Sequence, residues 1–306
     1  MRRRLLKSAL ATSATVCAAL LVSACAAEVQ GAPPTDGQRP QAPVIAPQAP
    51  PTEAPFVQQA PFDGLEARIG QATAQAAESG ADIELVVMDR TTGQTLSNGD
   101  NRPFPIASVV KLFIADDLLL QVAEGKTELS PADRASLDSM LSASNDGAAQ
   151  TFWNRNGRSA IISRIVARYG LTGTTAPYDN SKWDVTQSTA GDLVRYYDML
   201  LAGRGGLPPE QAEIIVGNLA RFTPTGLDGY PQRFGIPDGL PAETVAVKQG
   251  WFCCWNGGNQ LHVSTGIIGP DRRYVMAIGS LDPTGAATAR DNMTRAVKTM
   301  FPAGRI

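Results

Sequence analysis

Ser108 and Lys111 are the residues whose types and spacing most directly indicate chemistry. They lie three positions apart at the start of an apolar run, and residues three apart on a helix share one face. A serine in the first helical turn lies among free N–H groups that favour developing negative charge. A nearby lysine can accept the serine proton if burial or neighbouring cations keep its amine neutral. The pair predicts a nucleophile with its base, although an N-capping serine beside a lysine that extends to solvent gives the same spacing.

Two further segments carry polar residues in a fixed order after this pair. The tripeptide Ser-Asn-Asp at 144–146 lies between two predicted helices, and Lys-Gln-Gly at 248–250 ends a predicted strand. The three motifs together resemble the Ser-x-x-Lys, Ser-Asp-Asn and Lys-Thr-Gly set of class A β-lactamases and penicillin-binding proteins. The runs 112–118 and 247–254 are also similar to alanine-rich actinobacterial lipoproteins with a β-lactamase-like domain.

The resemblance implies a role for each matching residue and no cofactor. Ser108 would be the nucleophile and Lys111 its base. Ser144 would relay a proton to the leaving nitrogen, and Lys248 would supply positive charge near Ser144 and the substrate carboxylate. The backbone N–H groups of Ser108 and Trp251 would form the oxyanion hole.

Several positions depart from the family pattern. Asp146 replaces an asparagine, and an ionised carboxylate only accepts hydrogen bonds. Gln249, beside the matching Gly250, replaces a threonine near the substrate carboxylate with a longer amide that could donate or obstruct. Trp251 is larger than the small residue that is usual there.

The segment 171–187, where a β-lactamase carries its omega loop, contains no glutamate. The family's deacylating base is therefore missing, and Asp179 and Asp184 are the only carboxylates in that loop. We expect any acyl-enzyme to hydrolyse slowly, which favours penicillin-binding behaviour or a site without turnover.

His262 is the only histidine, and no His, Cys or Asp cluster has metal-ligand spacing, so we expect no metal. It lies near the position where many β-lactamases keep an arginine for the substrate carboxylate. Two interpretations stay open: a substrate-binding side chain, or a strand histidine with a satisfied hydrogen bond, which is favoured because histidine is a weaker anion anchor than arginine.

Hydrophobic periodicity predicts an α/β chain of the α+β type. A five-stranded antiparallel sheet, made by both ends of the chain, is expected to be flanked by terminal helices and to carry an inserted all-helical subregion. The predicted helices lie at 63–79, 107–123, 131–141, 147–154, 158–169, 189–202, 208–221 and 285–300, and the later strands at 245–251, 261–268 and 274–279. The pairs 116–117 and 196–197 are interpreted as packing and solvated helix faces.

The first residues form a targeting segment rather than part of the fold. Residues 1–24 combine a basic start with an apolar stretch, and the run Val-Ser-Ala-Cys at 22–25 resembles a lipobox. Cys25 would then carry a diacylglycerol that anchors the protein to the outer face of the cell membrane; a plain secretory signal is the alternative. Residues 25–61 are rich in proline and form a predicted tether, followed by one domain at 62–306.

Composition excludes some partners. Removing residues 1–24 leaves 23 basic and 29 acidic residues without a basic cluster, which argues against a nucleic-acid partner. Cys253 and Cys254 are adjacent in an oxidising compartment, where they could form a disulfide or remain as buried or solvent-facing thiols.

Three functions compete at this stage. The first is serine acyl transfer on peptidoglycan-type peptides, β-lactams or another amide or ester outside the membrane. The second is a catalytically silent binding or structural lipoprotein on the same fold, favoured by the departures at 146 and 249. The third is an esterase whose pocket is lined by Trp251, Phe252 and Trp255, aromatic residues that could equally belong to the core.

Overall fold

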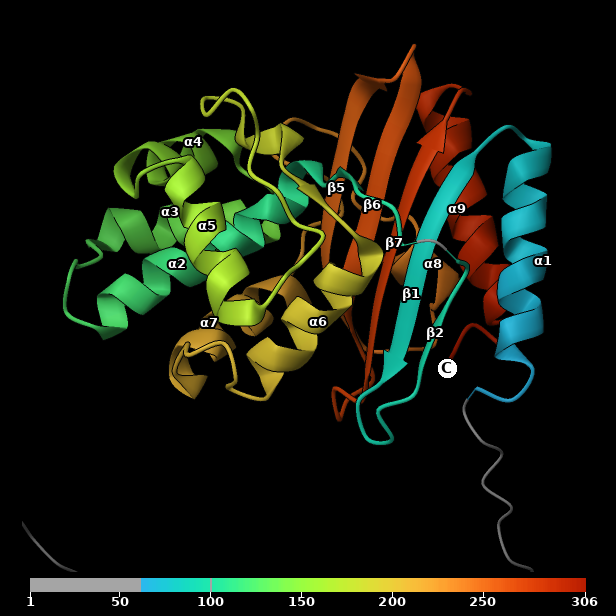
Figure 1. The fold of residues 1–306 in the computed structure, drawn as a ribbon, viewed down its shortest axis with the longest axis horizontal. Coiled ribbons are helices and arrows are strands. Elements are labelled where there is room, and N and C mark those ends of the chain that lie inside the picture. The colour runs from blue at the N-terminus through green and yellow to red at the C-terminus, as the bar shows by residue number, and fades with distance from the viewer. Residues whose placement is uncertain (1–61, 100) are drawn as a thin grey trace, which may run out of the picture. The chain divides into compact units, whose positions relative to one another are not determined.

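The computed structural model describes residues 62–99 and 101–306. The predicted signal segment, Cys25 and the tether lie outside the described residues. A five-stranded antiparallel sheet in the order β2-β1-β7-β6-β5 forms the centre of the domain (Figure 1). Its strands are β1 (Asp82–Asp89), β2 (Thr95–Ser97), β5 (Val245–Trp255), β6 (Asn259–Ile268) and β7 (Tyr274–Asp282). Because β1 pairs with β7, the two ends of the domain close one sheet, as the sequence predicted.

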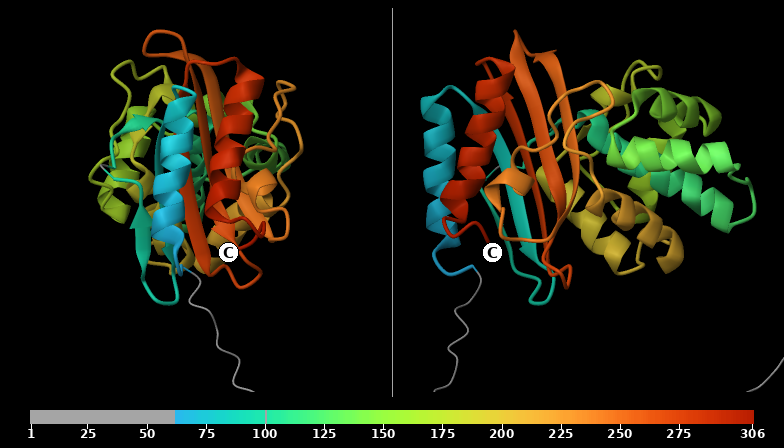
Figure 2. Two further views of the ribbon diagram at one scale, coloured as in Figure 1. Left: turned by 90° about the vertical axis from the view of Figure 1, so that its right-hand side faces the viewer. Right: turned by 180° about the vertical axis from the view of Figure 1, so that it is seen from behind.

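Two terminal helices cover one face of the sheet. Helices α1 (Leu65–Glu78) and α9 (Ala286–Met300) lie side by side there (Figure 2). Alternate β1 residues, Ile83, Leu85 and Val87, are buried in this layer. The period of two directs them to one face and sends Val86 to the other.

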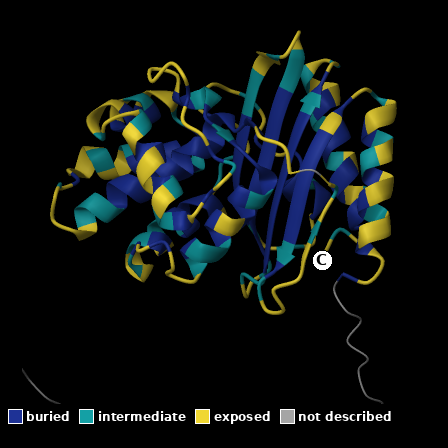
Figure 3. Ribbon diagram, viewed as in Figure 1, coloured by how far each residue is buried: buried dark blue, intermediate teal, exposed yellow. Residues whose placement is uncertain are grey.

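The helical subregion packs on the opposite face. Its helices are α2 (Lys111–Ala123), α3 (Pro131–Ser142), α4 (Asp146–Arg155), α5 (Ser159–Tyr169), α6 (Ala190–Leu201) and α7 (Pro209–Ala220). Helix α2 runs through its middle, and residues 111–119 are all buried (Figure 3). An apolar helix that is enclosed on all sides provides a fixed support for residues at its first turn.

Local signals set where the helices begin. Ser130 caps α3 through a reciprocal capping box with Asp133, and Pro131 follows at the first helical position. Thr189 caps α6 by accepting a hydrogen bond from the Asp192 N–H. These caps explain why the predicted starts of these two helices agree closely with the observed ones.

Several short elements join the two parts, and all but η1, which falls inside the helix predicted at 107–123, were not predicted. The two-residue strands β3 (Phe104–Pro105) and β4 (Gln187–Ser188) pair with each other, and α8 (Ile236–Gly239) lies on the α9 side of the sheet. Two single 3₁₀ turns, η1 (Ala107–Val110) and η2 (Trp183–Val185), contact each other. Elements of two to four residues contain too little periodicity to be seen in a sequence.

Neither Asp116 nor Asp117 is solvated, which corrects the sequence interpretation. Both side chains are buried. Asp117 accepts two hydrogen bonds from Arg164, at 2.6 and 2.8 Å, and Asp116 accepts one from Arg168. Their partners lie on α5, about 50 positions later in the chain, so a local sequence pattern could not reveal them.

Among the described residues, none of the helices is both long and apolar enough to cross a membrane.

Candidate active site

Ser108 lies where the helical subregion meets the edge strand β5. It belongs to η1, the 3₁₀ turn that leads directly into α2. The backbone of β5 passes so close that a Cβ on Gly250 would lie 2.6 Å from the Ile106 carbonyl oxygen and 3.3 Å from the Ser108 nitrogen. Only glycine permits this approach, so Gly250 fixes the distance between the strand and the serine.

Lys111 is fully buried one turn along the same face, and its amine points at Ser108. The Nζ atom lies 2.7 Å from Ser108 Oγ and 2.7 Å from the Ser144 carbonyl oxygen. It also lies 3.0 Å from Ser144 Oγ and 2.5 Å from Asp146 Oδ1. The structure therefore brings together four predicted residues from two separate motifs.

Lys248 completes this cluster from strand β5. Its Nζ lies 2.9 Å from Ser144 Oγ and 3.0 Å from the Gln249 carbonyl oxygen. The Ser144 hydroxyl is thus shared between the amines of Lys111 and Lys248. Such an arrangement can pass a proton from one side of the hydroxyl to the other.

Burial changes the acidity of both lysines. It lowers the pKa of Lys111, although the Asp146 carboxylate opposes this shift. Burial, with the neighbouring Lys111 as the next cause, holds the pKa of Lys248 well below its ordinary value. A lowered pKa increases the neutral fraction of an amine, which is the form that can accept a proton.

Asp146 reaches Lys111 from the first turn of α4. Asn145 caps that helix by accepting a hydrogen bond from the Ala148 N–H at 3.0 Å. The cap fixes the next residue, and 68% of the Asp146 side chain is exposed. The family asparagine would donate a hydrogen bond at this position, whereas Asp146 accepts one from Lys111 and favours its protonated form.

A cavity of about 680 Å³ opens in front of Ser108. Its lining residues are Ala107, Ser108, Asp146, Gln150, Asn154, Arg158, Ser181, Lys182, Trp183, Asp184, Asp228, Trp251 and Phe252. Of the two carboxylates in the predicted omega-loop segment, Asp184 lines the cavity. Asp179 does not line it, and its carboxylate caps the turn at Ser181 through hydrogen bonds of 2.9 and 2.7 Å.

Gln249 does not face the cavity, which differs from the sequence expectation. Its side chain is buried, and its amide nitrogen donates to the carbonyl oxygens of Gln232 at 3.0 Å and Phe234 at 2.7 Å. A long amide at this strand position ties β5 to the segment before α8. Its amide nitrogen is therefore engaged away from the cavity.

His262 is also enclosed. It is fully buried opposite Trp251 in the sheet, and its Nε2 lies 2.6 Å from the Tyr230 hydroxyl. The Phe234 ring packs edge-on against it. Burial, with the nearby Arg290 guanidinium acting in the same direction, lowers the pKa of His262 to about 4. His262 is therefore neutral at pH 7 and does not line the cavity.

The loop before α8 contributes residues that the sequence did not single out. The Trp251 indole donates to Asp228 Oδ2 at 3.1 Å and stacks on the Tyr230 ring. On the other wall, the Trp183 ring lies 5.0 Å from Lys111 Nζ. Trp251 and Phe252 do line the cavity, whereas Trp255 packs against Phe252 and does not. The one feature of the sequence that could have pointed to Asp228 is its place in the long, glycine- and proline-containing loop 221–235, because long loops often carry functional residues.

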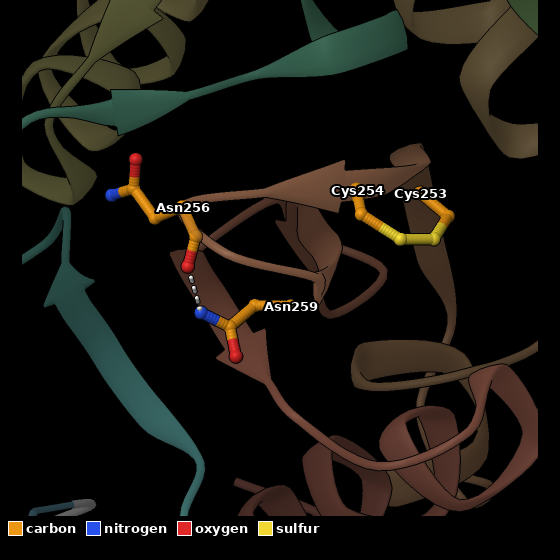
Figure 4. The surroundings of a disulfide bond; sticks show 4 residues. All are labelled: Cys253, Cys254, Asn256 and Asn259. Carbon is orange, nitrogen blue, oxygen red and sulfur yellow. Dashed lines mark hydrogen bonds between the residues drawn. A yellow bond between two sulfur atoms is a disulfide. The ribbon is translucent and has the colours of Figure 1, made fainter.

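A disulfide joins Cys253 to Cys254 near the exposed end of β5 (Figure 4). The following turn is closed by Asn259, whose amide donates to the Asn256 carbonyl oxygen at 3.0 Å. Across 62–99 and 101–306, no group of three His, Cys, Asp or Glu side chains could hold a metal ion.

The sheet, the terminal helices and the inserted helical subregion define the β-lactamase and penicillin-binding fold. A model of the Beta-lactamase enzyme family matches residues 65–132. The β-lactamase from Chitinophaga pinensis has a TM-score of 0.64 at 17% identity, covering 78% of this chain and 100% of that chain. PBP-A has a TM-score of 0.64 at 18% identity, covering 78% of this chain and 95% of that chain. The class A β-lactamase from Mycobacterium abscessus has a TM-score of 0.61 at 20% identity, covering 77% of this chain and 98% of that chain.

A narrower relationship comes from sequence. Proteins named "Putative lipoprotein LppW" from Mycobacterium bovis and Mycobacterium tuberculosis are 57% identical over 245 residues, which is 80% of this chain and 77% of each relative. The chain belongs to the LppW family, whose domain has the β-lactamase-like fold.

Proposed function

We propose that this protein is an exported, lipid-anchored serine acyltransferase or hydrolase that forms an acyl-enzyme on Ser108. The observation that carries the proposal is the 2.7 Å approach of the buried Lys111 amine to Ser108 Oγ beside an open cavity. In the neutral form, the amine would accept the serine proton as Oγ attacks the carbonyl carbon. Amides or esters of the peptidoglycan-peptide or β-lactam type are the substrate class that the family resemblance supports.

The remaining steps use the groups around this pair. The backbone N–H groups of Ser108 and Trp251 would stabilise the oxyanion. The Ser144 hydroxyl, 2.9 Å from Lys248 Nζ, would pass a proton to the leaving group as the bond to the acyl carbon breaks. Water or an acceptor amine would then release the acyl group. Because 171–187 contains no glutamate, we expect slow deacylation and weak or no β-lactam turnover.

The proposal also includes the organisation of the chain. Residues 1–24 would be removed as a signal peptide, Cys25 would carry the lipid on the outer face of the cell membrane, and 25–61 would tether the domain 62–306. The name of the LppW relatives supports the lipoprotein assignment. The lipobox-like run at 22–25 is the feature of this chain that carries it.

A catalytically silent binding lipoprotein is the second candidate, and one contact favours it. Asp146 lies 2.5 Å from Lys111 Nζ. An ion pair there would keep the lysine protonated and prevent it from accepting the serine proton.

Covalent labelling separates the two candidates. Full-length protein in detergent is incubated with a reporter penicillin and with an activated aryl ester, and the adduct is located by peptide mass spectrometry. We expect labelling on Ser108 that persists for many minutes and disappears in Ser108→Ala. Ser79→Ala, at the end of α1 and away from the cavity, controls for non-specific acylation and should label normally. A folded protein that takes up neither reagent would support the silent candidate.

A further inference from the structure

We propose that the cavity selects substrates by charge: acyl compounds that carry an ammonium group near the scissile bond acylate Ser108 faster than those that carry a carboxylate there, with Asp228 as the specificity-determining residue. This inference rests on the proposed function and narrows its substrate class.

Asp228 is an exposed residue of the loop before α8, and hydrogen bonds hold its carboxylate beside the edge strand β5. Its Oδ2 accepts from the indole of Trp251 at 3.1 Å, and its Oδ1 accepts from the Tyr230 N–H at 3.0 Å. The Gly226 N–H donates to the Tyr230 carbonyl oxygen at 2.7 Å and closes the loop around the carboxylate. Trp251 directly follows the 248–250 motif, so this negative charge lies next to the strand along which a substrate would bind.

Two of the three side chains expected near a substrate carboxylate are turned away, and only Lys248 stays beside Ser144. Gln249 is bonded to the segment before α8, and the buried, neutral His262 is bonded to Tyr230. The Arg290 guanidinium packs over the Tyr230 ring, 4.8 Å from its centroid, and does not line the cavity. Within the described ranges, no lysine or arginine lies within ion-pair distance of Asp228.

A second carboxylate acts in the same direction. Asp184 lines the cavity on η2 and has neither a hydrogen-bond nor an ion-pair partner in the part of the chain that the structure describes. The charges of Asp184 and Asp228 both act to raise the pKa of the Lys111 amine, against the larger lowering by burial. Both carboxylates therefore act electrostatically on the group that contacts Ser108. Two cations also line the cavity: Arg158 at the start of α5, and Lys182, which immediately precedes η2 and is two residues from Asp184. Neither comes from the loop that carries Asp228.

A matched set of substrates tests this inference. Three activated aryl esters of equal size carry an ammonium, a methyl or a carboxylate group on the acyl part, and the second-order rate constant for acylation of Ser108 is measured at low and high salt. We expect the ammonium ester to react about ten- to a hundredfold faster than the carboxylate ester, with a smaller ratio at high salt.

Variants assign the effect to Asp228. Asp228→Asn should reduce the ammonium-to-carboxylate ratio about tenfold, and Trp251→Phe, which removes the indole donor, should reduce it less. Glu66→Gln removes the same charge from α1 on the far face of the sheet and should leave the ratio unchanged. Equal rates for the three esters, or a faster carboxylate ester, would overturn charge selection. A ratio that survives in Asp228→Asn would overturn the role of Asp228. If no ester labels Ser108, the proposed function is wrong, and this inference, which depends on it, is wrong as well.

Discussion

Helix α2 buries three charged side chains, and two of opposite sign, Lys111 and Asp116, lie five residues apart in different surroundings. Asp116 is sealed in the helical subregion, where Arg168 and the hydroxyls of Tyr169 and Tyr196 all donate to it. Lys111 is equally buried, but one side of its site opens to a cavity, and its carboxylate partner Asp146 is largely exposed.

The difference separates a structural charge from a candidate reactive one. Burial raises the pKa of Asp116, and the donors around it oppose this shift. A buried carboxylate with three donors from the packed helices, and no open cavity beside it, fixes the elements around it. A buried amine with a lowered pKa beside an open cavity has the properties expected of a base. Changing each residue should therefore affect different measurements.

Lys111→Met should have the largest effect on reactivity. It removes the base, and we expect acylation of Ser108 by an activated ester to slow by about 100- to 10,000-fold. Stability to urea should change by no more than about 1 kcal/mol, because methionine has a similar volume and needs no charged partner. Labelling at the wild-type rate would contradict the assignment of Lys111 as the base.

Asp116→Ala should mainly affect stability. It leaves the Arg168 guanidinium and two tyrosine hydroxyls without their shared acceptor, so we expect a loss of about 3–5 kcal/mol in the free energy of unfolding. Urea denaturation measures this loss. Asp117→Ala is the matched control: its partner Arg164 is 43% exposed, so the loss should be smaller. Equal losses would show that enclosure does not distinguish the two carboxylates.

Asp146→Asn should have a smaller effect than the two changes above, and the effect should fall on the pH dependence of acylation. The Asp146 carboxylate raises the pKa of Lys111, so removing it should lower that pKa. Acylation that depends on the neutral amine rises with pH, and its profile should move to lower pH; the shift should be small, since the exposed carboxylate is partly screened. The rate of Ser108 acylation between pH 5 and 10 checks this. An unchanged profile would mean that Asp146 does not control Lys111.

Much of the fold was predictable because most elements are long and regular. The α2 run at 107–123 and the strand alternation at 245–251 gave the correct types at nearly the correct positions. The first four residues of that predicted helix form the 3₁₀ turn η1 instead. Periodicity distinguishes helix from strand, but it does not distinguish two helical geometries over one turn.

The site was predictable only in part, for physical reasons. The local helical spacing of Ser108 and Lys111 allowed this pair to be predicted. Ser144 and Lys248 could be assigned only from the order of the three motifs along the chain. The direction of Gln249 depends on two carbonyl oxygens in a loop 15 and 17 positions earlier, which no pattern in the sequence specifies. Asp228 was missed because its position depends on the indole of Trp251 across the cavity rim.

The backbone conformations of Ala107 and Ser144 affect how substitutions at these two positions would change stability and reactivity. Both residues have left-handed conformations, with φ of 45° and 56°, although neither is glycine. Each costs about 1–2 kcal/mol that glycine would avoid. Ala107 sets the direction of the Ser108 turn, and Ser144 holds the hydroxyl between the two lysines. Selection for heat resistance and selection for reactivity would therefore act in opposite directions on these two residues.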